Sequence, residues 1–160
     1  MPKTNENKNI IALYFIFMAA ILMNFAPSIS IQSWGSVLFI ITFIATYISK
    51  WTSKKESFKH AHYSYITKTI WIFSLLLTIS TLLAYLFGDH TIIENMVQSA
   101  QTGQLLTNQS VIQAIIEYGK ANLLIFITLF IPAVLYVLFR LAKGMHHARK
   151  NRTPSTTNWL

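Results

Sequence analysis

The sequence has no cysteine and few charged residues: Asp, Glu, Lys and Arg make up only 11% of its 160 residues. The absence of cysteine excludes disulfides, thiolate zinc sites and a cysteine nucleophile. The charged fraction is far below the value of about one quarter that is typical of soluble domains. Apolar residues account for 53% of the chain. These values indicate a single domain whose main solvent is lipid rather than water.

The usual signatures of catalysis are also missing. The chain contains no glycine-rich phosphate loop, no G-x-S-x-G serine, no H-E-x-x-H motif and no pair of carboxylates on one helix face. Histidines occur as His60 with His62 and as His146 with His147, spacings at which helical side chains diverge instead of converging on a metal. We therefore expect no enzyme activity, no metal and no cofactor. The net charge of +8 does not indicate nucleic acid, because the basic residues lie almost entirely outside the apolar stretches.

Four apolar stretches have about the 20 residues that a helix needs to cross a bilayer. They run approximately over residues 10–26, 31–48, 66–87 and 121–139. Twelve of the thirteen basic residues lie before the first stretch, between the end of the second and the first turn of the third, or after the fourth, and Lys120 is the exception. Because Lys and Arg accumulate in cytoplasmic loops, both termini should be cytoplasmic.

The predicted fold is therefore an all-α, integral membrane four-helix bundle with a bacterial inner-membrane location. Residues 1–9 form a cytoplasmic N-terminal segment, residues 10–144 the transmembrane domain, and residues 145–160 a basic cytoplasmic tail. One alternative stays open at the start of the chain. Lys3 and Lys8 followed by a short apolar stretch also resemble a signal peptide, whose removal would leave three spans.

The outer loop between the third and fourth stretches is too long to be structureless in a compact protein. A capping box of Thr91 and Glu94 predicts a first short helix that ends near Gly103. A second is expected from about Ser110 to Gly119. Both are amphipathic, and they lie on the outer membrane surface, cap the bundle or dock a larger partner.

Small and hydroxyl residues recur at helical spacing in the second and third stretches. They are Gly35, Thr42, Thr46 and Ser49 in the second, and Thr67, Ser74, Thr78 and Thr81 in the third. The two stripes can face each other as a packing seam, because helices in lipid associate through small residues and weak hydrogen bonds. The alternative is a polar groove or pore lining. In the fourth stretch, Pro132 predicts a kink.

Two short motifs lie where the third stretch begins and the fourth ends. The run His62-Tyr63-Ser64-Tyr65-Ile66-Thr67-Lys68-Thr69-Ile70-Trp71 resembles the H-[FY]-x-[YW]-x-x-[RK]-T-x-W entry to the third span of a group of small bacterial inner-membrane proteins. Phe139-Arg140-Leu141-Ala142-Lys143-Gly144 resembles that group's aromatic-Arg-x-x-x-Gly exit. The group is distantly similar to the chloroplast Tic-type import component, and its function is mostly unknown. Ile66 stands where the group often has Gln.

The candidate lipid- or partner-binding residues are His62, Lys68, Trp71, Arg140 and Lys143. They either anchor the helices in the interface or bind anionic headgroups or a partner on the cytoplasmic side. The leading hypothesis is a non-enzymatic accessory or assembly subunit of a larger inner-membrane complex, whose partners are membrane lipids and other membrane subunits. The alternatives are a small transporter or import-channel-like conduit, and a holin-like membrane-disrupting protein.

Overall fold

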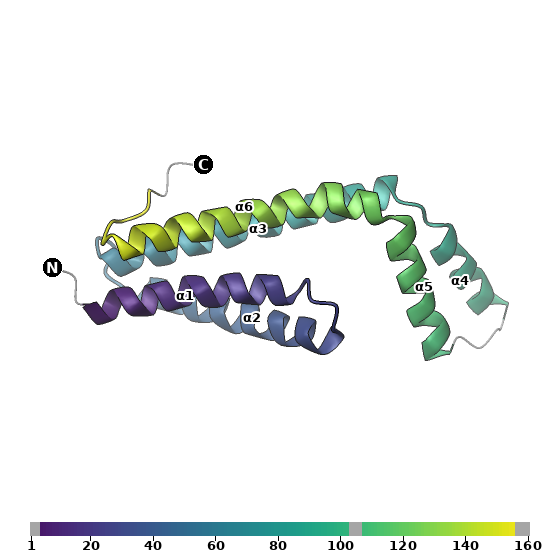
Figure 1. The fold of residues 1–160 in the computed structure, drawn as a ribbon, viewed down its shortest axis with the longest axis horizontal. Helices are drawn as coiled ribbons and strands as arrows, with labels where there is room; N and C mark the ends of the chain where they lie inside the picture. The colour runs from purple at the N-terminus through teal and green to yellow at the C-terminus, as the bar shows by residue number, and fades with distance from the viewer. Residues whose placement is uncertain (1–3, 103–106, 156–160) are drawn as a thin grey trace. The chain divides into compact units, whose positions relative to one another are not determined.

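The computed structural model describes residues 4–102 and 107–155, and its regular structure is helical (Figure 1). In chain order the helices are α1 (Thr4–Met23), α2 (Ile29–Thr52), α3 (Phe58–Phe87), α4 (Thr91–Gln101), α5 (Asn108–Ala121) and α6 (Leu123–Arg149). No strand occurs in these two ranges, which confirms the predicted all-α class. The chain divides into two compact units, Met1–Leu75 with Val134–Leu160, and Leu76–Ala133. Helices α3 and α6 therefore contribute to both units.

Within the described parts of the chain, three helices, α2, α3 and α6, are long and apolar enough to cross a membrane. Each is longer than the predicted apolar stretch, because helical hydrogen bonding continues into the polar flanks. The corresponding apolar part of α1, Asn7–Met23, is shorter. Large apolar side chains are exposed on these helices, and Trp51 is 80% exposed. Such surfaces are unfavourable in water and suit lipid, as expected of a membrane protein.

The first unit begins with a hairpin of α1 and α2 (Figure 1). A Cβ added at Gly35 would lie 2.8 Å from the Cβ of Met23 and 3.1 Å from the carbonyl oxygen of Ala20, so glycine permits this close approach. In the connection, the Asn24 amide donates to the Ala20 carbonyl at 2.8 Å and accepts from the Ser36 hydroxyl at 2.6 Å. These contacts hold the two helices together at the turn.

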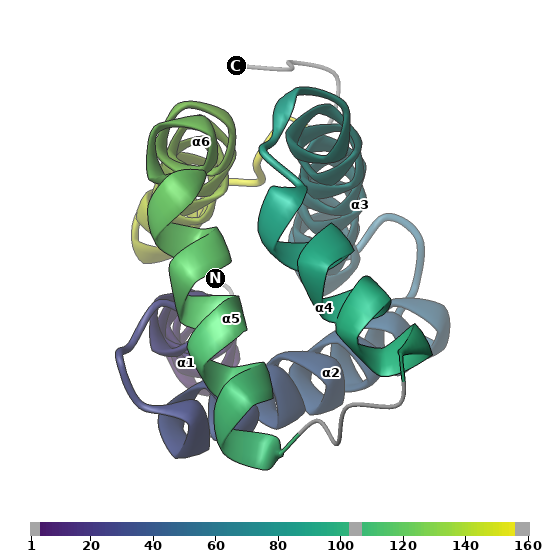
Figure 2. The ribbon, with the colours of Figure 1, turned by 90° about the vertical axis from the view of Figure 1, so that its right-hand side faces the viewer.

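The second unit is organised around Asn122, whose side chain is buried. Its Oδ1 accepts the Asp89 backbone N–H at 2.7 Å, and its Nδ2 donates to the Asp89 carbonyl at 3.0 Å. Beside it, a Cβ added at Gly88 would lie only 2.5 Å from the Ala84 carbonyl oxygen. Asn122 thus joins the segment after α3 to the segment before α6. Helices α4 and α5 both extend from this junction and spread apart toward their far ends (Figure 2).

The two helices predicted in the outer loop are present, but α4 is capped differently. His90 is its N-cap residue and makes no side-chain cap hydrogen bond, and Thr91 is its first helical residue. The carboxylate of Asp89, one residue before His90, accepts hydrogen bonds from the Thr91 backbone N–H and hydroxyl. The predicted capping box of Thr91 and Glu94 is therefore wrong. An ionised carboxylate two residues earlier is a stronger acceptor for the first N–H groups than a threonine hydroxyl.

The second outer helix, α5, begins slightly before its predicted start at Ser110. Thr107 is its N-cap, and the Thr107 hydroxyl oxygen accepts the Ser110 backbone N–H at 3.2 Å. Gly103, the predicted end of the first outer helix, lies outside the described residues, as do residues 1–3 of the predicted N-terminal segment and residues 156–160 of the predicted tail.

Pro132 lies within α6, which continues as a helix on both sides of it. Proline has no N–H, so the carbonyl of Thr128, four residues earlier, loses its usual donor. The hydroxyl of Ser80 donates to the adjacent carbonyl, that of Leu129, at 2.9 Å. A side chain from α3 thus bonds the α6 backbone close to the proline, while the predicted kink stays a prediction.

Candidate functional site

A buried arginine is the centre of the polar structure in the first unit. Arg140 on α6 is only 1% exposed. Its Nε donates to the Thr69 hydroxyl oxygen at 3.3 Å, and its Nη1 donates to the Tyr136 hydroxyl oxygen at 3.0 Å. The guanidinium carbon lies 4.9 Å from the centre of the Tyr65 ring. An ionised group away from water needs hydrogen-bond acceptors and ring faces around it, so the network holds this charge inside the protein.

Helical spacing explains why these partners converge. Tyr136 lies one turn before Arg140 on α6, and Tyr65 and Thr69 are four residues apart on one face of α3. The Tyr65 hydroxyl donates to the Arg140 carbonyl at 3.1 Å. The Thr69 hydroxyl donates to the Tyr65 carbonyl at 2.8 Å, which allows its oxygen to accept from Arg140. Helices α3 and α6 are therefore joined by hydrogen bonds donated from each helix to the other.

A buried histidine connects three distant parts of the sequence. His62 is 0% exposed, its Nδ1 lies 3.1 Å from the Tyr14 hydroxyl, and its Nε2 lies 3.1 Å from the Arg152 carbonyl oxygen. A carbonyl oxygen can only accept, so in the neutral imidazole Nε2 carries the proton. Nδ1 then accepts from the Tyr14 hydroxyl. The Phe58 ring, with its centre 4.5 Å from that of His62, covers the imidazole.

The position of Tyr14 depends on a glycine in α6. A Cβ added at Gly144 would lie 2.6 Å from both Cε1 and the hydroxyl oxygen of Tyr14. The phenol ring therefore lies directly on the α6 backbone, where any other residue would push it away. Through Tyr14, His62, Tyr65, Arg140 and Gly144, the structure brings the two sequence motifs into one network.

Sequence reasoning missed several members of this network. Tyr14, Thr69 and Tyr136 were not candidates, although the four-residue spacing from Tyr136 to Arg140 was a usable signal. Nothing in the sequence pairs Tyr14 with His62, because that contact depends on how α1 packs. Arg152 contributes only its carbonyl, which no side-chain pattern can show.

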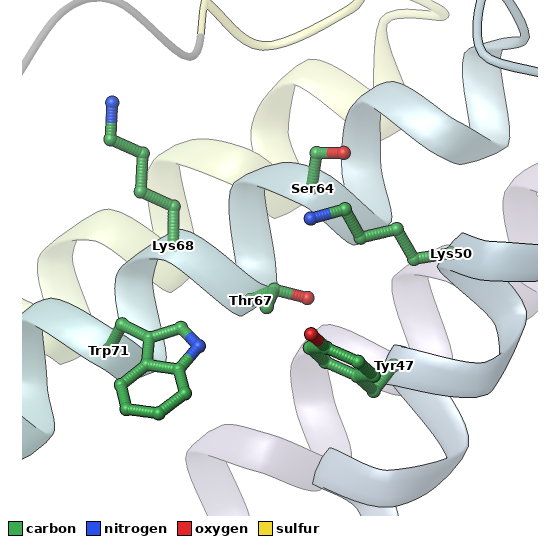
Figure 3. A pocket seen from close by; sticks show the side chains of 6 residues that line it. All are labelled: Tyr47, Lys50, Ser64, Thr67, Lys68 and Trp71. Carbon is green, nitrogen blue, oxygen red and sulfur yellow. The ribbon is translucent and has the colours of Figure 1, made fainter.

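The five candidate binding residues do not form one cluster. His62 and Arg140 are buried in the network, and Lys143 is exposed on α6. Lys68 and Trp71 instead line a hollow of about 450 Å³ between α2 and α3, which we call the lysine hollow (Figure 3). It is lined by Tyr47, Lys50, Ser64, Thr67, Lys68 and Trp71.

Some residues of the predicted seam are buried and others are exposed. Gly35, Thr42 and Thr46 are buried on one face of α2, but the neighbours of Gly35 belong to α1 and the following turn. Ser49 is half-buried and Thr67 is buried. The remaining members, Ser74, Thr78 and Thr81, are exposed.

The threonines of this set bond largely within their own helices. The hydroxyls of Thr42, Thr46, Thr67 and Thr81 each donate to the carbonyl four residues earlier, at 2.6 to 2.8 Å. Such bonds satisfy a hydroxyl in lipid without a partner helix. Hydroxyl spacing alone was therefore insufficient to identify which helices pack together.

The described histidines and carboxylates do not assemble a metal site: no group of three or more potential ligands occurs within residues 4–102 and 107–155. Comparison of the chain with known protein families, curated proteins and solved structures finds no match. The resemblance of the two motifs to small bacterial inner-membrane proteins therefore stays a prediction.

Proposed function

We propose that this chain is a non-enzymatic, four-span protein of the bacterial inner membrane, with both ends cytoplasmic, that serves as an accessory or assembly subunit of a larger membrane complex. Helices α2, α3 and α6 supply three spans. The apolar part of α1, Asn7–Met23, has 17 residues, which is the lower limit for a transmembrane helix and supports a fourth, short span. The distribution of Lys and Arg supports the orientation.

The observation that carries the accessory role is the exposed apolar surface of the α4–α5 hairpin. These helices have 11 and 14 residues, too few to cross a bilayer. They nevertheless expose large apolar side chains: Ile93, Val97, Ile112, Ile115 and Ile116. An apolar surface outside the spans is unfavourable in water, and a second membrane subunit would cover it.

Site-specific photocrosslinking in native membranes tests this role. A photoreactive amino acid at Ile115, which is 64% exposed, should crosslink to one membrane protein that also copurifies stoichiometrically in mild detergent. The matched control is Gln113, whose side chain bonds to Glu117 on the polar side of α5. Crosslinks from Ile115 to lipid alone would place the hairpin on the membrane surface and contradict the accessory role.

A conduit is the second candidate, and the exposed hydroxyls of α3 favour it. Thr78 and Thr81 line a shallow hollow of about 550 Å³ together with Leu77, Leu82 and Tyr85. Because the chain has no cysteine, a single cysteine at Thr78 can report water access. Under the accessory proposal, a membrane-impermeant thiol reagent leaves this cysteine unmodified in intact membranes. Rapid modification at Thr78, with protection at the buried Thr42, would favour the conduit.

A further inference from the structure

The lysine hollow combines positive charge with several hydrogen-bond donors. Lys50 enters it from the last turn of α2, and Thr67, Lys68 and Trp71 come from α3. Figure 3 shows the Lys50 ammonium, the Thr67 and Tyr47 hydroxyls and the Trp71 indole nitrogen directed toward the same space. The Lys68 ammonium leaves the same side of α3 and points outward from them.

The hollow is held in place by contacts between the two helices. The His60 ring nitrogen Nδ1 lies 3.1 Å from the Lys50 carbonyl oxygen, which joins the last turn of α2 to the first turn of α3. Farther along, the Phe43 and Trp71 rings meet edge to face with centroids 6.5 Å apart. Because both ends are fixed, the Lys50 side chain starts from a defined position beside α3.

The chemistry of the lining fits a phosphate anion. The six lining residues carry two ammonium groups and no carboxylate, and Tyr47, Ser64 and Trp71 provide further donors. Lysine is a common phosphate ligand, acting as a point charge.

The surroundings of the hollow fit a lipid rather than a soluble anion. On adjoining turns, α2 exposes Ile44 and Ile48, and α3 exposes Leu75. Trp71 itself is 61% exposed, and tryptophan is enriched where headgroups meet acyl chains. A phospholipid can thus place its phosphate among the donors and its acyl chains along these apolar residues.

We propose that the lysine hollow binds the phosphate of an anionic phospholipid, with Lys50 as the charged ligand, Tyr47 and Trp71 as neutral donors, and Lys68 at the outer edge of the hollow. This site involves α2 and α3 alone, so it does not depend on the accessory role assigned to the α4–α5 hairpin. Failure of one proposal would leave the other intact.

Quenching of Trp71 by brominated lipid tests the proposal. The full chain, with Trp34, Trp51 and Trp159 replaced by phenylalanine, is reconstituted into phosphatidylcholine vesicles containing increasing brominated phosphatidylglycerol. In a parallel series only the phosphatidylcholine is brominated. Trp71 should be quenched at lower mole fractions of brominated phosphatidylglycerol than of brominated phosphatidylcholine. The association constant of phosphatidylglycerol relative to phosphatidylcholine should fall about fivefold in Lys50→Gln.

Two variants control for charge and for folding. Lys54→Gln removes the same charge from the exposed α2–α3 connection and should keep the preference for anionic lipid. Lys50→Arg retains the charge and should also keep the preference for anionic lipid. Circular dichroism verifies the helix content of each variant. Equal quenching by both lipids in the parent chain, or equal losses in Lys50→Gln and Lys54→Gln, would overturn the proposal.

A competition experiment distinguishes lipid from soluble phosphate. Millimolar glycerol 3-phosphate should leave the quenching by brominated phosphatidylglycerol unchanged, because it lacks the acyl chains that lie along the apolar turns. Displacement of the lipid by this soluble ester would overturn the assignment to phospholipid.

Discussion

Replacing Gly144 by alanine should destabilise the first unit, because the Tyr14 ring occupies the space of the added methyl group. The alanine Cβ would lie 2.6 Å from Tyr14 atoms, about 1 Å inside ordinary van der Waals contact. Relief requires moving a buried ring that is bonded to His62. Overpacking costs about 1–3 kcal/mol and the hydrogen bond about 1 kcal/mol. Since alanine favours helix over glycine by about 1 kcal/mol, the net loss in unfolding free energy should be about 1–3 kcal/mol.

Reversible unfolding in mixed micelles, followed by circular dichroism, measures this loss. The matched control is Gly119→Ala in α5, where an added Cβ meets nothing within 4 Å and stability should rise by about 0.5–1 kcal/mol. In a Tyr14→Ala background the clash is absent, so Gly144→Ala should become neutral or stabilising. Equal costs of Gly144→Ala with and without the Tyr14 ring would refute the steric reasoning.

Three further predictions concern the second unit. Asn122→Ala should lower the unfolding free energy by about 2–3 kcal/mol, because it leaves the backbone N–H and carbonyl of Asp89 without their partners. As a control, Asn95→Ala at an exposed position should change the unfolding free energy by less than about 0.5 kcal/mol in the same assay. Ser80→Ala should cost about 0.6 kcal/mol, the average for a hydrogen bond between membrane helices, and a loss above about 2 kcal/mol would contradict that role. Hydrogen bonds from the Thr91 hydroxyl and backbone N–H hold the pKa of the Asp89 carboxyl below its usual 3.8, so these bonds are fully formed above that pH and are lost as pH falls through the lowered pKa. Thr91→Ala should therefore raise the titration midpoint of Asp89 measured by NMR. An unchanged midpoint would exclude the hydroxyl as the cause of the lowered pKa.

The helices of this protein were largely predictable because their signals are local. Apolar stretches of about 20 residues identified α2, α3 and α6, and amphipathic patterns identified α4 and α5. The cap of α4 was missed because Asp89 and Thr91 both suit a helix start, and sequence spacing favoured the threonine. In the structure His90 is the N-cap residue, and the Asp89 carboxylate accepts the hydrogen bonds from Thr91.

The buried network was less predictable because its partners are distant in sequence. The motifs contain His62, Arg140 and Gly144, all of which take part in the network, but the sequence suggested a position on the cytoplasmic rim rather than inside the protein. Periodicity showed which face of α2 carries Gly35 without showing that α1 would pack against it. The periodicity of a helix shows which of its faces is buried, whereas the helix that packs against this face depends on how all the helices are arranged.

The bonds of His62 also impose an order on the biogenesis of the protein. Its partners lie 48 residues before it, at Tyr14, and 90 residues after it, at Arg152. A ribosome adding about 5–20 residues per second needs about 5–18 s to reach Arg152 after making His62. During that interval the imidazole can bind Tyr14 but has no Arg152 carbonyl to accept its other N–H. The contact between Tyr14 and His62 can therefore form before the Arg152 carbonyl is available, and a chain stalled before Arg152 would lack the acceptor for the second imidazole nitrogen.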